Sequence, residues 1–189
     1  YAREQGMRVT GIFHDAIAWR HPEMVRHWTR GQHADYMEAL ADLDGLVAVS
    51  EEAAGDFIEF ARSRGLRLPP VNVCTLAAEI EGQARETQRG ISTDGTIRIL
   101  CVSTLEPRKN HARVIEAFEV TAARCPRIKM ELHLVGAEYN AVPEIAREVR
   151  TVTERNSAVL WHECVSADEL RKWYQACDFT VFGSWIEGF

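Results

Sequence analysis

The sequence of 189 residues lacks the patterns that mark several large classes of protein. Its five cysteines are odd in number and no two have C-x-x-C spacing, which disfavours a disulfide framework and indicates free thiols in a reducing compartment. Its seven histidines are scattered without metal-ligand spacing, so we expect no metal site. No internal repeat of short, fixed period is present.

The sequence also lacks long apolar runs and an excess of positive charge. No stretch approaches the roughly 18–20 apolar residues that span a bilayer, and no signal peptide is visible in the sequence, whose first residue is Tyr1. Because that residue is not Met, the presence of a targeting segment ahead of it stays an open question. The net charge of −6 argues against nucleic acid as a partner. We expect a cytoplasmic protein, with peripheral association at the inner face of the membrane as an open alternative.

What the sequence does contain is an alternation of strand-like and helix-like segments. In the first part, strands are predicted at residues 7–13, 46–49 and 71–74, and a helix at 25–43. A second helix is predicted between Ser50, which can cap it, and Gly65, which can end it. Residues 77–95 are polar, weakly periodic and punctuated by glycine, as expected of a linker.

The alternation resumes more clearly after the linker. Strands are predicted at residues 96–102, 130–135, 158–161 and 179–182, with helices at 110–124, 143–155 and 166–176. Ser166 and Glu169 form a capping-box pattern at the start of the last helix. We therefore predict an α/β fold of two Rossmann-like domains with parallel sheets, both incomplete in this chain: residues 1–80, a linker at 81–95, and residues 96–189.

A basic turn follows the strand at residues 96–102. The segment CVSTLEPRKNHAR places four basic or potentially basic side chains where the next helix begins, and Asn110 is predicted to cap that helix. Cations are mildly unfavourable at the positive end of a helix dipole, unless an anion such as phosphate binds there. The alternative is a solvated basic surface in which Glu106 is the partner. The basic side chains are those of Arg108, Lys109, His111 and Arg113.

Two further strand ends carry polar residues of types that bind ligands or transfer protons. The last strand leads into Glu187 and Gly188. The carboxylate of Glu187 can accept hydrogen bonds from sugar hydroxyls, and Gly188 permits the backbone to approach a ligand closely. The first strand leads into His14 and Asp15, which suit a proton relay or a positioned donor. The plainer interpretations are an exposed loop Glu, a capping Asp and a satisfied His.

Taken together, these motifs resemble glycosyltransferase family 4. ILCVSTLEPRKN is similar to the strand, loop and helix that open the donor domain of that family, and DFTVFGSWIEGF to its D-x-x-V-x-P-S-x-x-E-G-F-G signature. VLWHECVSADELRKWYQACDF and the His-Asp turn resemble two other family segments. Ser103 stands where the family commonly has Gly, Thr104 where many members have Arg, and Gly183 where Pro is common. The hinge region at residues 69–79 also departs from the family pattern.

The resemblance implies a GT-B fold and a set of site residues. It implies that Arg108 and Lys109 contact the donor diphosphate, that Glu187 contacts the donor sugar, and that His14, beside Asp15, touches the transferred sugar. It adds Thr104, Gly188 and Phe189 to the donor-binding set. A second Glu of the family signature would lie past Phe189, so we expect no transfer from these 189 residues alone.

The resemblance also implies the reaction. Family members are generally retaining and need no bound metal or other cofactor. The expected donor is a nucleotide-diphosphate sugar, with GDP-mannose favoured by the LEPRKN form, and the expected acceptor is a glycan or polyprenyl-linked molecule in surface polysaccharide synthesis. Arg20, His21 and Arg30 are weaker candidates for meeting an anionic acceptor. Two alternatives stay open: a non-catalytic nucleotide-sugar-binding module, and a sugar-nucleotide epimerase.

Overall fold

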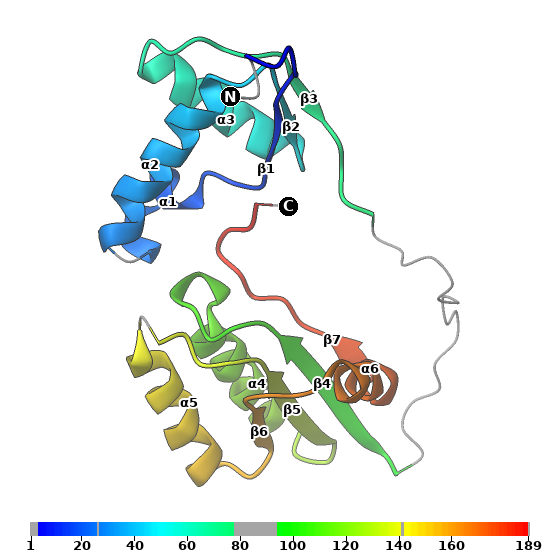
Figure 1. Ribbon diagram of the computed structural model, residues 1–189. Coiled ribbons are helices and arrows are strands. Elements are labelled where there is room, and N and C mark those ends of the chain that lie inside the picture. The colour runs from blue at the N-terminus through cyan, green and yellow to red at the C-terminus, as the bar shows by residue number, and fades with distance from the viewer. Residues whose placement is uncertain (1–3, 26, 78–93, 141, 189) are drawn as a thin grey trace. The chain divides into compact units, whose positions relative to one another are not determined.

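The structure is a computed structural model that describes residues 4–25, 27–77, 94–140 and 142–188. The chain divides into two compact units, residues 1–83 with 186–189, and residues 84–185 (Figure 1). The four residues 186–189 thus group with the first unit, whereas the sequence places them in the second domain. The predicted linker at 81–95 lies almost wholly outside the described residues.

The first unit is built on a three-stranded parallel sheet. Its strands β1 (Thr10–Phe13), β2 (Gly45–Ala48) and β3 (Val71–Val73) pair in the order β1-β2-β3. The helices are α1 (Ile17–Arg20), the 3-10 helix η1 (Pro22–Met24), α2 (His27–Ala41) and α3 (Glu51–Ser63). The first strand is shorter than predicted, because residues 7–9 are not in the ladder and Met7 is 58% exposed. The short elements α1 and η1 were not predicted.

The core of this unit forms between alternate strand residues and the apolar faces of two helices. Phe13, Leu46 and Ala48 are fully buried and pack with Met37 of α2 and Phe57 of α3. The Oγ of Ser50 accepts a hydrogen bond from the Ala53 N–H at 3.0 Å, so the predicted cap of α3 is confirmed. Gly65 follows α3 with a φ of +65°, the left-handed conformation that commonly ends a helix.

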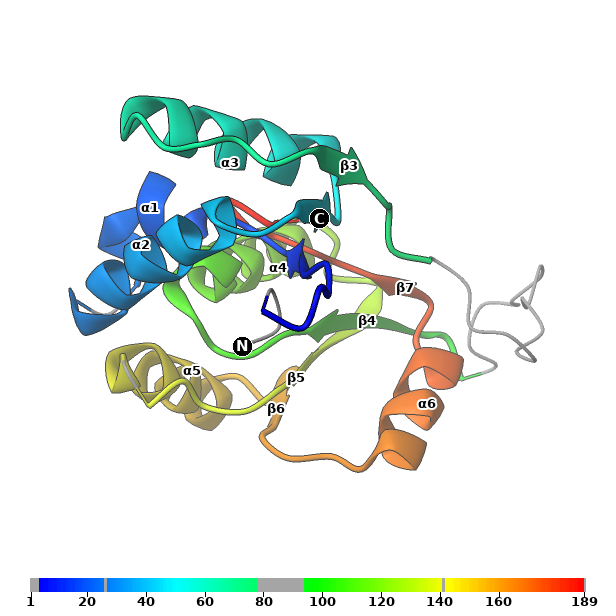
Figure 2. The same ribbon diagram turned by 45° about the horizontal axis from the view of Figure 1, so that its top comes forward.

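The second unit is built on a four-stranded parallel sheet whose order is β6-β5-β4-β7. The strands are β4 (Thr96–Val102), β5 (Lys129–Val135), β6 (Val159–His162) and β7 (Phe179–Thr180). Between them lie the 3-10 helix η2 (Pro107–Lys109) and the helices α4 (His111–Arg124), α5 (Pro143–Arg155) and α6 (Ala167–Ala176). The chain runs outward from β4 to β6 and then returns to the other side of β4 (Figure 2). The strand order therefore reverses between β4 and β7, where open α/β sheets bind their ligands.

Alternating strand residues of this sheet face two separate apolar clusters. Ile99, Leu132 and Leu134 pack with Phe118 of α4 and Val149 of α5 on one face. On the other face Leu100, Val135 and Cys177 pack with Leu170 and Trp173 of α6. Helices thus cover both faces, as expected of a parallel sheet. The five cysteines form no disulfide, and Cys101 and Cys177 are buried.

Local signals in this unit were confirmed in part. The capping box of Ser166 and Glu169 is present, and Pro143 is the first residue of α5. Leu170 and Trp173 of α6 pack against the sheet, whereas Tyr174 of the same helix is 42% exposed. Within the described part of the chain, no helix combines the length and the apolar character that crossing a membrane requires.

Candidate functional site

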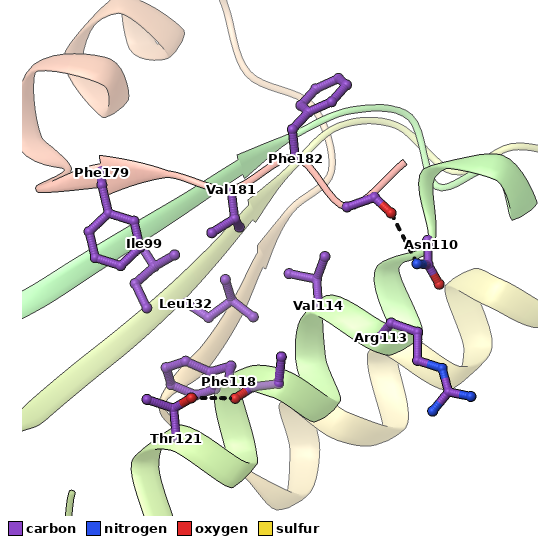
Figure 3. A pocket seen from close by; sticks show the side chains of 12 residues that line it. Ile99, Asn110, Arg113, Val114, Phe118, Thr121, Leu132, Phe179, Val181 and Phe182 are labelled. Atoms are coloured by element: carbon purple, nitrogen blue, oxygen red, sulfur yellow. Dashed lines mark hydrogen bonds between the residues drawn. The ribbon is translucent and has the colours of Figure 1, made fainter. Parts of the chain in front are cut away.

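Two loops meet at the reversal point of the second sheet, one after β4 and one after β7. The backbone N–H of Trp185 donates to the carbonyl of Arg108 at 2.8 Å. The side-chain Nδ2 of Asn110 donates to the carbonyl of Gly183 at 3.0 Å, the bond drawn in Figure 3. These bonds fix the basic turn against the segment that leads toward Glu187. The structure therefore brings together two motifs that are far apart in the sequence.

Asn110 holds this arrangement by a conformation that the sequence analysis did not predict. It has φ 58° and ψ 38°, and its side chain caps nothing, so the prediction of an Asn110 cap on α4 was wrong. Asparagine tolerates the left-handed region better than most residues, and here its amide is used for the bond to Gly183. The first turn of α4 consequently has neither a side-chain cap nor an acidic residue. Its positive end is available to an anion.

The cations at this end differ in their surroundings. The Nε of Arg108 lies 2.8 Å from the Glu106 carboxylate, which is the pairing that the solvated-surface interpretation predicts. The Nζ of Lys109 lies 5.1 Å from the ring centroid of Phe182, a cation–π contact across the two loops. Arg113 pairs with Glu116 on the exposed side of α4. Of these three cations, Lys109 is thus the one whose ammonium group contacts the loop after β7.

His111 is not one of the cations. It is only 2% exposed, and burial, followed by the charge of Lys109, lowers its pKa to about 4. His111, which is potentially basic from its sequence alone, is therefore neutral near neutral pH. Its Nε2 lies 3.0 Å from the Oγ of Ser103, a contact that sequence reasoning missed. The only signal in the sequence was Ser103 itself, which replaces the glycine common in the family that the chain resembles.

An apolar groove of about 450 Å³ lies beside the turn. Figure 3 shows Val114 and Phe118 of α4 on one side and Val181 on the other, with Asn110 at one end. Its lining has little that could bind a phosphate, because the Arg113 guanidinium is paired with Glu116. The candidate position for an anion is therefore the uncapped end of α4 and not the groove.

The remaining candidate residues lie in the first unit. The carboxylate of Asp15 accepts a hydrogen bond from the Ile17 N–H at 3.0 Å, a local turn just before α1. The N-cap residue of α1 is Ala16, and no side chain caps the helix, so the plainer interpretation of Asp15 as a capping residue was wrong. His14 is exposed at the end of β1. Glu187 and Gly188 line a small polar pocket of about 140 Å³ together with Asp15. Phe189 lies outside the described residues.

Gly188 allows a close backbone approach at this pocket. The Ser50 Oγ donates to its carbonyl at 2.9 Å, and a Cβ at position 188 would lie 2.5 Å from the Cβ of Asp15. Any larger residue would displace the chain from Asp15. The structure thus places Asp15, Glu187 and Gly188 together, whereas His14 does not line the pocket.

The weaker candidates for an anionic acceptor are already paired or not described. Arg20 lies within hydrogen-bond distance of Asp56 and Glu59, and the Nδ1 of His21 lies 3.2 Å from Glu23. The side chain of Arg30 is outside the described part of the structure. Thr104 is half-buried in the loop after β4. Among the described residues, no three His, Cys, Asp or Glu side chains are grouped so that they could hold a metal ion.

Comparison with known proteins bears on the family and on the fold. Residues 96–189 match the family described as glycosyl transferases group 1. Over 97% of its length the chain is 24% identical to the serotype-specific mannosyltransferase WbdA of Escherichia coli. With these matches and its two parallel α/β sheets, the chain belongs to the group 1 glycosyltransferases, and its fold is GT-B.

Solved structures support the fold at lower identity. The Anabaena protein HepE, crystallised with UDP and glucose, matches all of this chain with a TM-score of 0.72 and 18% identity. A UDP-forming trehalose-phosphate synthase from Burkholderia xenovorans matches 99% of it with a TM-score of 0.70 and 12% identity. The chain spans 50% of each of these two chains and 24% of the WbdA sequence.

Proposed function

We propose that the protein is a retaining glycosyltransferase that moves a hexosyl unit from a nucleotide-diphosphate sugar to a glycan or polyprenyl-linked acceptor. The observation that carries this proposal is the pair of bonded loops at the sheet reversal, with an uncapped helix N-terminus and Lys109 beside them. Free N–H groups, the helix dipole and a lysine together suit a diphosphate. In this proposal residues 96–189 belong to the donor-binding domain, residues 1–80 to the acceptor-binding domain, and residues 81–95 link the two.

Each candidate residue has a role in the proposed reaction. Lys109 and Arg108 stabilise the negative charge that develops on the leaving nucleoside diphosphate, a role that cations fill without a metal ion. Thr104, in the same loop, contacts the diphosphate, and Gly188 and Phe189 line the donor sugar. Glu187 accepts hydrogen bonds from that sugar. His14 orients it from the end of β1, and Asp15 fixes the start of α1 directly after His14.

Two similarities bear on which nucleotide sugar is the donor. The 24% identity to a protein named mannosyltransferase favours GDP-mannose, whereas the Anabaena neighbour was crystallised with UDP and glucose. Titrating GDP-, UDP- and dTDP-sugars into the full-length protein distinguishes these donors. Release of the nucleoside diphosphate is then measured with and without acceptor. Acceptor-dependent release supports transfer, binding without release indicates a non-catalytic module, and sugar interconversion without acceptor indicates an epimerase.

Replacing His14 by alanine tests the acceptor-side part of the proposal. We expect the variant of the full-length protein to lose transfer by about tenfold, the value of one well-placed hydrogen bond. The melting temperature should not change, because the His14 side chain is exposed. Gln32→Ala is the control, since Gln32 is exposed on α2 of the same unit and has no role in the proposal. Unchanged turnover in His14→Ala would remove His14 from the site.

A further inference from the structure

A serine and a buried histidine join the end of β4 to the start of α4. The Ser103 Oγ and the His111 Nε2 are 3.0 Å apart, and the second ring nitrogen of His111, Nδ1, is buried without a hydrogen-bond partner. Ser103 is the first residue after β4, and its N–H donates to the Val135 carbonyl at 3.0 Å. The pair therefore lies on fixed backbone, with Ser103 before and His111 after the segment that carries Arg108 and Lys109.

The position of His111 determines which ring nitrogen carries the proton. Burial keeps the ring neutral above its pKa of about 4, so one nitrogen is protonated and the other has a lone pair. His111 is the first residue of α4, where uncapped backbone N–H groups make the potential positive. A lone pair is favoured at the buried Nδ1, and an unpaired buried N–H is rarer than an unpaired acceptor. The proton is consequently placed on Nε2, which donates to Ser103.

This proton assignment directs the hydroxyl hydrogen of Ser103 away from His111. The Ser103 side chain hydrogen-bonds the Cys101 thiol, two residues earlier, but sulfur is a weak acceptor compared with an anionic oxygen, so a phosphate can take over this hydrogen. Burial raises the pKa of that thiol, so it stays protonated. Ser103 is only half-buried, so its hydroxyl can reach a ligand at the strand end.

The positive charge of Lys109 acts on the side chains around Ser103. After burial, Lys109 is the second cause that lowers the pKa of His111, and it also acts on Cys101 against the effect of burial. The positive charge of Lys109 thus acts on both of the side chains that neighbour the Ser103 hydroxyl.

We propose that Ser103 donates a hydrogen bond to a phosphate of the nucleotide-sugar donor and that His111, by donating to the Ser103 Oγ, is the residue that positions it. The inference rests on the proposed function, because it requires the diphosphate to bind at the basic turn. It extends the donor site to a side chain that replaces the glycine common at this position.

The test is a titration of GDP and of UDP into variants of the full-length protein. Ser103→Ala should raise the Kd of the better nucleotide by about tenfold, the effect of losing one charge-assisted hydrogen bond. Ser103→Thr keeps the hydroxyl and should bind within about threefold of the unchanged protein. Thr151→Ala removes an exposed hydroxyl from α5 and is the matched control, with no expected change in Kd. Equal affinities for Ser103→Ala and the unchanged protein would overturn the inference.

Lys109→Ala in the same series separates this inference from the proposed function. If Lys109→Ala binds both nucleotides as tightly as the unchanged protein, the diphosphate does not bind at the turn and the proposed function fails. If Lys109→Ala loses binding and Ser103→Ala does not, only the role of Ser103 fails.

A double-mutant cycle tests the positioning role of His111. His111→Leu should raise the Kd in the Ser103 background but have no further effect once Ser103 is alanine, because both changes remove the same hydrogen bond. Melting temperatures of all variants show whether a loss of binding reflects unfolding. Imidazole ¹⁵N shifts near neutral pH supply an independent readout. A proton on Nδ1, or additive effects of the two substitutions, would contradict the proposed orientation.

Discussion

Replacing Lys109 by alanine is expected to lower kcat/KM for glycosyl transfer by about 10²–10³-fold, the usual effect of removing one group that stabilises transition-state charge. The leaving diphosphate gains negative charge as the sugar bond breaks, and the lysine is held beside the uncapped start of α4 by the Phe182 ring. Arg108 cannot replace it fully, because its guanidinium is shared with Glu106. We therefore expect the loss mainly in kcat, since the charge on the diphosphate is greatest in the transition state.

The assay uses the full-length protein and its best nucleotide sugar at saturating acceptor. Lys129→Ala is the matched control, because Lys129 begins β5 and therefore lies at the opposite end of the same sheet from the site. The control should retain its full rate and the melting temperatures of both variants should match. A Lys109→Ala enzyme with more than a third of the original kcat/KM would show that the basic turn is surface charge and not a diphosphate site.

Most of the fold was predictable because its elements carry strong, local signals. The bounds of β4 and α5 match the prediction to the residue, since β4 is rich in apolar and β-branched residues and α5 begins at a proline. The short elements α1 and η2 were missed, because three or four residues show no periodicity. The order β6-β5-β4-β7 does not follow from any segment alone, since it depends on which strands pack as neighbours.

The residues of the candidate site follow from the sequence, whereas the contacts among them do not. Arg108 and Lys109 form a basic turn at the carboxyl end of a strand. That pattern indicates an anion site even without the family resemblance. The charge state of His111 did not follow, because it depends on burial that no local pattern reveals. The backbone of Asn110 was mispredicted for a related reason. Its choice between capping α4 and bonding Gly183 is made by a segment more than 70 residues away.

Gly136 is the residue whose replacement should be most damaging to stability. It follows β5 with φ +152°, a conformation that residues with a side chain rarely adopt. A Cβ at this position would overlap the Ser103 carbonyl group and would lie 3.1 Å from the Thr104 nitrogen. These are backbone atoms at the end of β4, so no side-chain rotation relieves the overlap. The Gly136 carbonyl also accepts the Trp161 indole N–H at 2.9 Å, which restricts its own movement.

We expect Gly136→Ala to destabilise the protein by about 3–5 kcal/mol, combining backbone strain with overpacking against the strand end. Because the displaced atoms support Ser103 and the basic turn, any protein that still folds should also bind nucleotide more weakly. Thermal unfolding followed by circular dichroism measures the first effect and the nucleotide titration the second. Gly55→Ala is the matched control, since Gly55 lies within α3 with nothing near its missing Cβ, and it should gain about 1 kcal/mol. If Gly136→Ala melts at the temperature of the unchanged protein, the close packing between the ends of β4 and β5 is not needed, and the rigid support that we assign to the turn is wrong.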